Sequence, residues 1–301
     1  MQEQLEYAAA WLVLKTLGAL PRPVSRALAV GVTRLLLLLR PRLRQTAMFN
    51  LRLAFPNWSN AQRRAVIRKM VRHIGRMAAE FALFPRWTRE NVERVVVLDG
   101  HENFLAGKSR GKGLLLLGGH VGGWELSSFG LGMYGCPLHY MARPLDNARV
   151  DALINRYRCL SGNRPIFKNQ SAREMLRVIR GAGTVGILAD HNTLPEEGVF
   201  VDFFGKAACA TTGIARAALH TDAPVVPVYA YWDGALRKYR LRIEPPVELV
   251  RTGDRDRDIL ENTQRFAKVL EGIIRNHPDQ WVWAHARWKT RPQGEPPLYP
   301  F

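Results

Sequence analysis

The sequence predicts an α/β fold with a mostly parallel central sheet flanked by helices, preceded by N-terminal membrane-associated helices. The 301 residues are 47% hydrophobic and 23% charged, which describes a folded chain long enough to bury a large core. Short β-rich runs closed by Gly, Asp or Pro alternate with helical patterns after residue 90, and this alternation indicates a parallel sheet. We therefore divide the chain into an N-terminal membrane-associating helical segment, residues 1–45, and an α/β domain, residues 46–301.

The first 40 residues are unusually apolar for a water-soluble protein. The runs 6–21 and 24–40 are rich in Ala and Leu, but single cations such as Arg26 and Arg34 interrupt them. Neither run reaches the ~18–20 uninterrupted apolar residues of a spanning helix. Arginines beside a leucine-rich face, with Trp11 nearby, fit a helix that lies in the membrane interface. A single tilted span and an amphipathic helix packed on the protein's own core are the alternatives.

The next elements follow from hydrophobic periodicity. Residues 60–84 carry an apolar stripe at helical spacing, with Ser59 or Asn60 as the cap. Period-two or continuous apolar runs then predict strands at 94–100, 113–120, 185–190, 224–232 and 238–249. Helical patterns predict helices at 125–135, 147–162, 171–183, 211–223 and 261–278, the fourth of them starting on the threonines of the run TTG.

The charge balance indicates a polyanionic partner. There are 44 Lys+Arg against 26 Asp+Glu, a net charge of +18, and most of the excess lies before residue 90. We find no RRM, zinc-finger or helix-turn-helix pattern, so we expect an anionic membrane surface and no nucleic acid. A basic surface that serves only solubility is the alternative. The three cysteines have no ligand spacing, and no signal-peptide cleavage pattern follows the N-terminal apolar stretch.

One motif carries the chemistry: GLLLLGGHVGGWELSSF, residues 113–129. The run LLLL followed by GGH places His120 just beyond the apolar part of the predicted strand, at the edge where the loops of α/β sheets bind ligands. On one continuous helix, residues five apart are separated by about 500° of rotation and point apart. With His120 on the loop and Glu125 in the first helical turn, the two side chains can meet. The motif therefore predicts a His120–Glu125 dyad in which the carboxylate orients the imidazole as a general base.

The glycines of this motif have expected roles of their own. Gly118 and Gly119 permit tight backbone geometry, while Gly122 and Gly123 leave space for a substrate beside the imidazole. Backbone N–H groups of this loop are candidates to stabilise an oxyanion.

The chain offers no protein nucleophile for this base. It has no GxSxG elbow and no cysteine in a matching loop, so the base must activate a substrate hydroxyl or water. His101, His139, His220 and His277 show no metal-ligand spacing. A purely structural His120 is the alternative.

Five blocks together resemble the bacterial lipid A late acyltransferases, the lauroyl and myristoyl transferases of the lysophospholipid acyltransferase superfamily. The resemblance spans nearly the whole chain, and two positions depart from the family pattern: Gly123 replaces Asn, and Ala286 replaces Arg. The blocks are RQTAMFNLRLAFPNWS, GGHVGGWEL, ARPLDNARVDALINRYR, LADHNTLPEEGVFVDFFGKAACATTG and WVWAHARWKTRP.

The resemblance implies an acyltransferase at the inner (cytoplasmic) membrane, with its active site facing the cytoplasm. The donor would be an acyl-carrier-protein or CoA thioester as co-substrate, and the acceptor a hydroxyl of a lipid A precursor. The resemblance implies neither metal nor cofactor. Another membrane lipid as acceptor (a phosphatidylinositol mannoside or a glycerophospholipid), or a non-catalytic membrane- or polyanion-binding module, is the alternative.

The resemblance also assigns residues to the site. His120 would be the base and Glu125 its orienting partner. The substrate-binding residues would be Arg158, Asp190, Arg143 and Gly205, with Asp190 ordering Arg158 and the two arginines binding phosphates.

Overall fold

The computed structural model describes residues 1–167 and 171–299, so residues 168–170 and 300–301 of the predicted second domain lie outside the described part. The helices are α1 (Gln2–Ala19), α2 (Arg22–Leu39), α3 (Pro41–Ala54), α4 (Asn60–Ala82), α5 (His101–Ser109), α6 (Trp124–Met133), α7 (Ala148–Arg158), α8 (Ser171–Arg180), α9 (Gly213–Thr221) and α10 (Arg255–Asn276). The strands are β1 (Val96–Asp99), β2 (Leu114–Gly118), β3 (His139–Ala142), β4 (Arg164–Phe167), β5 (Thr184–Leu188), β6 (Gly198–Phe203), β7 (Lys206–Thr211), β8 (Val225–Asp233) and β9 (Lys238–Ile243).

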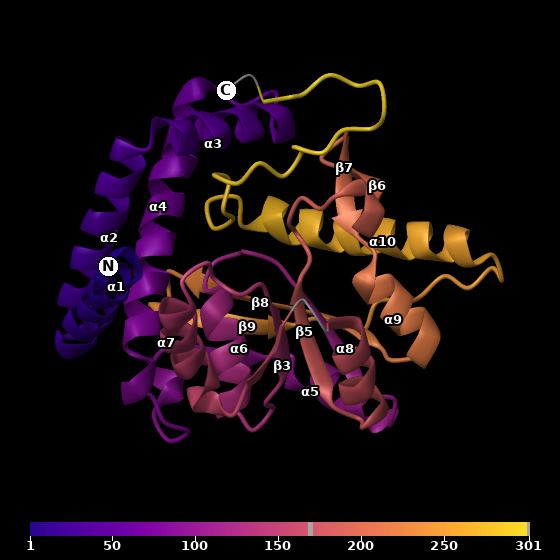
Figure 1. The fold of residues 1–301 in the computed structure, drawn as a ribbon, viewed down its shortest axis with the longest axis horizontal. Helices are drawn as coiled ribbons and strands as arrows, with labels where there is room; N and C mark the ends of the chain where they lie inside the picture. The colour runs from indigo at the N-terminus through magenta and orange to yellow at the C-terminus, as the bar shows by residue number, and fades with distance from the viewer. Residues whose placement is uncertain (168–170, 300–301) are drawn as a thin grey trace.

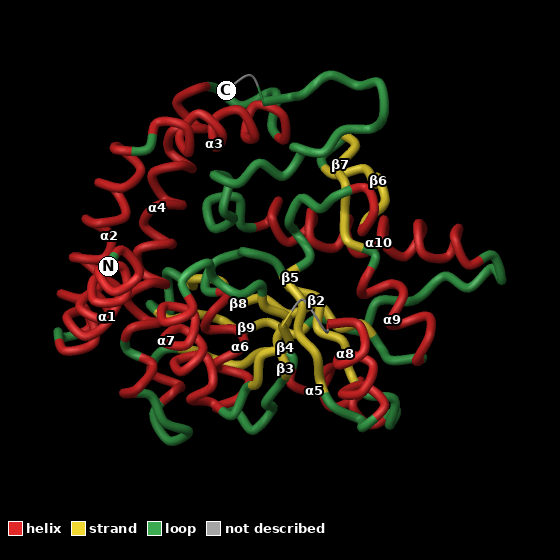
Figure 2. Tube along the Cα trace, viewed as in Figure 1, coloured by secondary structure: helices red, strands yellow, loops and turns green. Residues whose placement is uncertain are grey.

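A seven-stranded sheet forms the centre of the molecule, in the order β1-β9-β8-β2-β5-β3-β4 (Figure 2). Neighbouring strands of the sheet run parallel, except for the antiparallel pair β8–β9. Helices pack on the sheet, which confirms the predicted α/β class with a mostly parallel sheet. The pair β2–β5 is in register from Leu114↔Thr184 to Gly118↔Leu188, so the loops that follow these two strands leave the sheet side by side.

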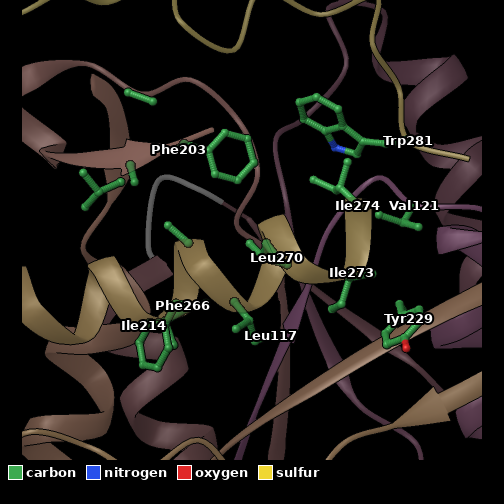
Figure 3. Close-up of a cluster of buried hydrophobic side chains, with 14 of the residues drawn as sticks. Leu117, Val121, Phe203, Ile214, Tyr229, Phe266, Leu270, Ile273, Ile274 and Trp281 are labelled. Carbon is green, nitrogen blue, oxygen red and sulfur yellow. The ribbon is translucent and has the colours of Figure 1, made fainter. Parts of the chain in front are cut away.

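Both faces of the sheet are buried, as a parallel sheet requires. Alternate residues of β2 enter two different cores: Leu115 and Leu117 join one, and Leu114 and Leu116 the other. The first core includes residues of α8, α9 and α10, and the second includes residues of α5, α6 and α7 (Figure 1). Figure 3 shows Leu117 of β2 beside the α10 side chains Leu270 and Ile273.

The N-terminal helices pack against α4 at one end of the molecule (Figure 1). No helix in the described residues is long and apolar enough to cross a membrane. The predicted boundary between residues 45 and 46 falls inside α3, and the division into two domains stays a prediction.

Four strands, β3, β4, β6 and β7, were not expected from the sequence. β3 and β4 are four residues each, too short to show a period. β6 and β7 form a hairpin directly before the helix predicted at 211–223, and this helix, α9, begins only at Gly213. Thr212 stands at the N-cap position of α9, but its side chain makes no capping hydrogen bond.

Candidate active site

His120 lies in the loop between β2 and α6 and is fixed from both its backbone and its ring. Its backbone N–H donates to Oδ2 of Asp190 (2.7 Å), and its Nδ1 lies 2.8 Å from Oδ1 of the same carboxylate. Its carbonyl accepts from the N–H of Val282 (3.2 Å). The side chain keeps 18% of its surface exposed, so Nδ1 is bound inward while the ring remains accessible. Such an imidazole can exchange a proton at Nε2.

Asp190 is buried and holds both the backbone N–H and the ring of His120 in place. It follows β5, the neighbour of β2, and is 1% exposed. The indole N–H of Trp281 donates to Oδ2 (2.7 Å), so three donors satisfy the two carboxylate oxygens. Burial would raise the pKa of Asp190, but the charge and hydrogen bond of His120 lower it well below its ordinary value. Asp190 is therefore ionised at neutral pH.

Asp190 also sets the protonation behaviour of His120. Burial lowers the pKa of the His120 imidazole, but the charge and the hydrogen bond of Asp190 outweigh burial and raise the pKa above its ordinary 6.5. Glu125 adds a smaller effect in the same direction. A carboxylate on Nδ1 favours the imidazolium that forms when Nε2 takes a proton.

Glu125 has a different partner from the one the sequence predicts. It lies in the first turn of α6, but its oxygens accept two hydrogen bonds from Arg158 at the end of α7, at 2.9 Å from Nε and 2.5 Å from Nη2. Burial lowers the pKa of Arg158, but the hydrogen bonds and charge of Glu125 raise it overall. The predicted pairing is thus exchanged: the carboxylate on the His120 ring is Asp190, and the carboxylate that orders Arg158 is Glu125. Spacing alone cannot distinguish these pairings, because both carboxylates lie near the same sheet edge.

The glycines of the loop make room for the protein itself, not for a substrate. A Cβ on Gly122, whose φ is +57°, would lie 2.2 Å from the carbonyl oxygen of Ala230. A Cβ on Gly123 would lie 2.8 Å from Cε1 of Tyr239. The expectation that these two glycines open space for a substrate is therefore wrong.

The backbone donors of the loop are also engaged. Besides the His120 N–H, that of Val121 donates to Gly119, that of Gly122 to Gln280 and that of Gly123 to Ala230, at 2.7–2.8 Å. These four groups are not free to stabilise an oxyanion. Arg158 is better placed, because two of its five N–H donors suffice for the bonds to Glu125.

Two further histidines complete the cluster. The His191 ring follows Asp190 in the chain and packs edge-on against His120, with centroids 4.2 Å apart. The His285 ring lies 6.0 Å from His191 and 6.4 Å from His120. Burial lowers the pKa of His285 to about 4, so this ring is neutral at pH 7. The residue run Asp190-His191 was expected at this edge of the sheet, but nothing in the sequence placed His285 there.

Asn50 connects the N-terminal helices to this site. It is fully buried in α3, and its Nδ2 donates to the carbonyls of Trp283 and His285, each at 2.8 Å. The C-terminal segment that carries Trp281 and His285 is thereby held by a helix more than 230 residues away in sequence. The only sequence signal was the resemblance of the NLRLAFP block to the family.

The remaining predicted site residues lie apart from the histidines. Arg143 is exposed in the loop after β3 and forms no ion pair with the described residues. Gly205 occupies the exposed turn of the β6–β7 hairpin with a φ of +75°, a conformation that favours glycine without any ligand. Trp281, Trp283 and Trp288 are fully buried, as expected for a packing motif.

Comparison with known proteins gives a consistent result. Residues 2–290 match the family described as bacterial lipid A biosynthesis acyltransferase. A lipid A biosynthesis lauroyltransferase of Escherichia coli (strain K12) is 30% identical over 96% of this chain and 92% of its own length. The palmitoleoyltransferase of the same organism is 27% identical over 96% and 94%, and the myristoyltransferase 25% over 84% and 77%. The chain therefore belongs to the bacterial lipid A biosynthesis acyltransferase family and is an acyltransferase of the lipid A late type.

Proposed function

We propose that this protein transfers a fatty acyl chain from an acyl-carrier-protein or CoA thioester to a hydroxyl of a lipid A precursor, with His120 as the general base. Family membership supports the reaction class. The observation that carries the residue assignment is the pairing of His120 Nδ1 with the buried, ionised Asp190. This pairing leaves Nε2 as the basic nitrogen of an accessible ring.

The proposed step needs no protein nucleophile. The acceptor hydroxyl gives its proton to Nε2 of His120, and its oxygen attacks the thioester carbonyl carbon. The tetrahedral intermediate then collapses, the C–S bond breaks, and the imidazolium returns the proton to the leaving thiolate. The products are an ester and a free thiol. Asp190 holds the ring and stabilises its charged form without taking the proton.

Glu125 and Arg158 take a second role in this proposal. Their charges act on the pKa of His120, Glu125 raising it and Arg158 lowering it. The two hydrogen bonds that Arg158 donates to Glu125 fix the guanidinium, and its remaining N–H groups are available for the thioester carbonyl oxygen or an acceptor phosphate. Glu125 is thus a positioning residue for Arg158. We keep Arg143 as an exposed candidate for phosphate binding.

We further propose that α1 and α2 dock on the cytoplasmic face of the inner membrane. α2 turns its polar side inward: Arg22 and Arg26 bind the buried Glu80 of α4 at 2.8 and 2.6 Å. Its outward side is apolar, and its exposed leucines and valines are Val24, Leu28, Val32, Leu35, Leu36, Leu38 and Leu39. Exposed arginines, among them Arg34 and Arg40, lie along and beside this apolar side. An apolar face bordered by cations suits an anionic lipid surface.

The reaction is tested with purified protein, a tetra-acylated lipid A precursor and acyl-carrier-protein or CoA thioesters of several chain lengths. Mass spectrometry should detect the precursor plus one acyl group, together with free thiol in equal amount. Parallel reactions contain a phosphatidylinositol mannoside or a lysophospholipid as the acceptor. Addition only to one of these acceptors would replace lipid A as the substrate, and no acyl addition with any donor would contradict the proposal.

A further inference from the structure

Three imidazoles converge at the mouth of the site, although the proposed transfer uses only one. Ligand atoms of His120, Asp190 and His191 lie within 4.8 Å of one another. His285 is not part of this group, but its ring centroid lies 6.0 Å from that of His191 and 5.0 Å from that of Trp281. Three rings bound to one tetrahedral zinc ion, with Zn–N bonds near 2 Å, have centroids about 5 Å apart. The observed centroid distances are 4.2, 6.0 and 6.4 Å, one below that value and two above it.

The orientation of the rings is the second observation. A histidine that binds a metal usually gives its other ring N–H to a carboxylate or a backbone carbonyl. His120 has Asp190 on Nδ1. This ring therefore has one nitrogen held by oxygen and the other nitrogen open. Nε2 of His285 is buried and has no hydrogen-bond partner among the described residues.

Asp190 takes the role of support and not of ligand. Its oxygens already accept from the His120 backbone, the His120 ring and the Trp281 indole. A carboxylate behind a histidine raises the basicity of the imidazole as a ligand. The donor set is thus three neutral nitrogens with one coordination position left for water, which suits zinc or another divalent transition metal.

From this geometry we infer that His120, His191 and His285 bind a divalent transition-metal ion such as Zn²⁺, and that this binding inhibits acyl transfer. The metal occupies Nε2 of His120, the atom that must accept the proton of the acceptor hydroxyl. Metal and reaction therefore compete for one lone pair. The inhibition rests on the proposed function, whereas the binding does not.

Binding is tested first, without any activity measurement. Protein free of a polyhistidine tag is titrated with Co²⁺, and the visible absorption of tetrahedral cobalt is recorded. We expect one Co²⁺ ion to bind per chain and Zn²⁺ to displace it. His191→Gln and His285→Gln should each weaken binding ~10-fold or more. His220→Gln is the matched control, because His220 lies on α9 beside Arg180 and outside the cluster. Circular dichroism establishes that each variant folds.

Inhibition is tested next, in the acyl-transfer assay with Zn²⁺ and then excess EDTA. Zinc should inhibit and EDTA should restore the rate, and His191→Gln should need ~10-fold more zinc relative to its own uninhibited rate. Cobalt absorption that is unchanged in both His191→Gln and His285→Gln would overturn the inference, as would transfer that continues at full rate when the site is filled. If the protein has no transfer activity, the proposed function fails while the cobalt titration still decides the metal site.

Discussion

Asp190 and Glu80 are both buried carboxylates, with exposures of 1% and 0%, but their surroundings differ. Asp190 faces a titratable ring, and its two oxygens satisfy three donors. Glu80 faces two permanent cations, Arg22 and Arg26, and only its Oε1 is bonded within the described structure. The first arrangement prepares a proton transfer, because one nitrogen of the ring stays open. The second neutralises charges between helices and fixes α2 on α4. Changes at the first should cost rate, and changes at the second should cost stability.

The largest effect is expected at the ring that Asp190 orients. His120→Ala removes the general base and should lower the rate of acyl transfer ~10³-fold. The free energy of unfolding should fall less than in Glu80→Ala, because the buried Asp190 loses the imidazole but keeps the backbone N–H of residue 120 and the Trp281 indole as donors. Mass-spectrometric initial rates and urea unfolding measure the two quantities. A variant with near-normal rate would show that His120 is not the base.

The opposite outcome is expected at Glu80. Glu80→Ala leaves two arginines without their partner and should lower the free energy of unfolding by about 3 kcal/mol. This value is at the low end for buried pairs, since the arginine side chains are 22% and 18% exposed. Urea unfolding measures it, and Glu80→Gln, which keeps an acceptor, should lose less. A strong loss of transfer in the still-folded variant would contradict the division between the two regions.

The next prediction concerns the outward, apolar side of α2. Leu38→Ser with Leu39→Ser should weaken sedimentation with anionic phospholipid vesicles ~10-fold, because each leucine contributes up to about 2 kcal/mol when buried in lipid. Both side chains are about two-thirds exposed, at 66% and 65%, so unfolding should be unaffected. Leu236→Ser, in the exposed β8–β9 turn, is the control. Unchanged sedimentation of the double variant would place the membrane contact elsewhere.

The smallest effect concerns the point where the two regions meet. Tyr239 packs against Gly123 of the catalytic loop, and the charges of Glu80 and Arg26 act on its pKa, which burial raises. Gly123→Asn, which restores the family's usual residue, should cost about 2 kcal/mol of unfolding free energy through overpacking on the Tyr239 ring. Adding Tyr239→Leu should recover part of this loss in a double-mutant cycle. Additive effects would mean that the ring is not the obstacle.

Much of the site was predictable because its residues follow strands. His120 and Asp190 come directly after β2 and β5, and the parallel register of this pair brings them together. The pairing was not predictable, since Glu125 and Asp190 are both carboxylates near one sheet edge. Nor could the sequence place His285 or Asn50, whose contacts join segments more than 230 residues apart.

The fold, like the site, was only partly predictable from the sequence. The strands with long apolar runs, such as β2 and β8, were predicted from the sequence. The short strands β3 and β4 were not predicted. The β6–β7 hairpin was not predicted either, because hairpin pairing depends on a turn with positive φ at both Phe204 and Gly205. The space beside Gly123 was misassigned to substrate, since Tyr239, which fills it, comes from β9.

The pH dependence of acyl transfer tests the central claim, that Asp190 and not Glu125 supports the base. The base acts unprotonated, so kcat/KM of the wild type should rise with pH through a pKa above 6.5. Asp190→Asn removes the charge that raises this pKa, so the rise should move to lower pH while the maximal rate falls ~10²-fold. Glu125→Gln leaves Asp190 in place and should move the rise by less, with circular dichroism confirming that both variants fold. A larger displacement in Glu125→Gln than in Asp190→Asn would contradict the account.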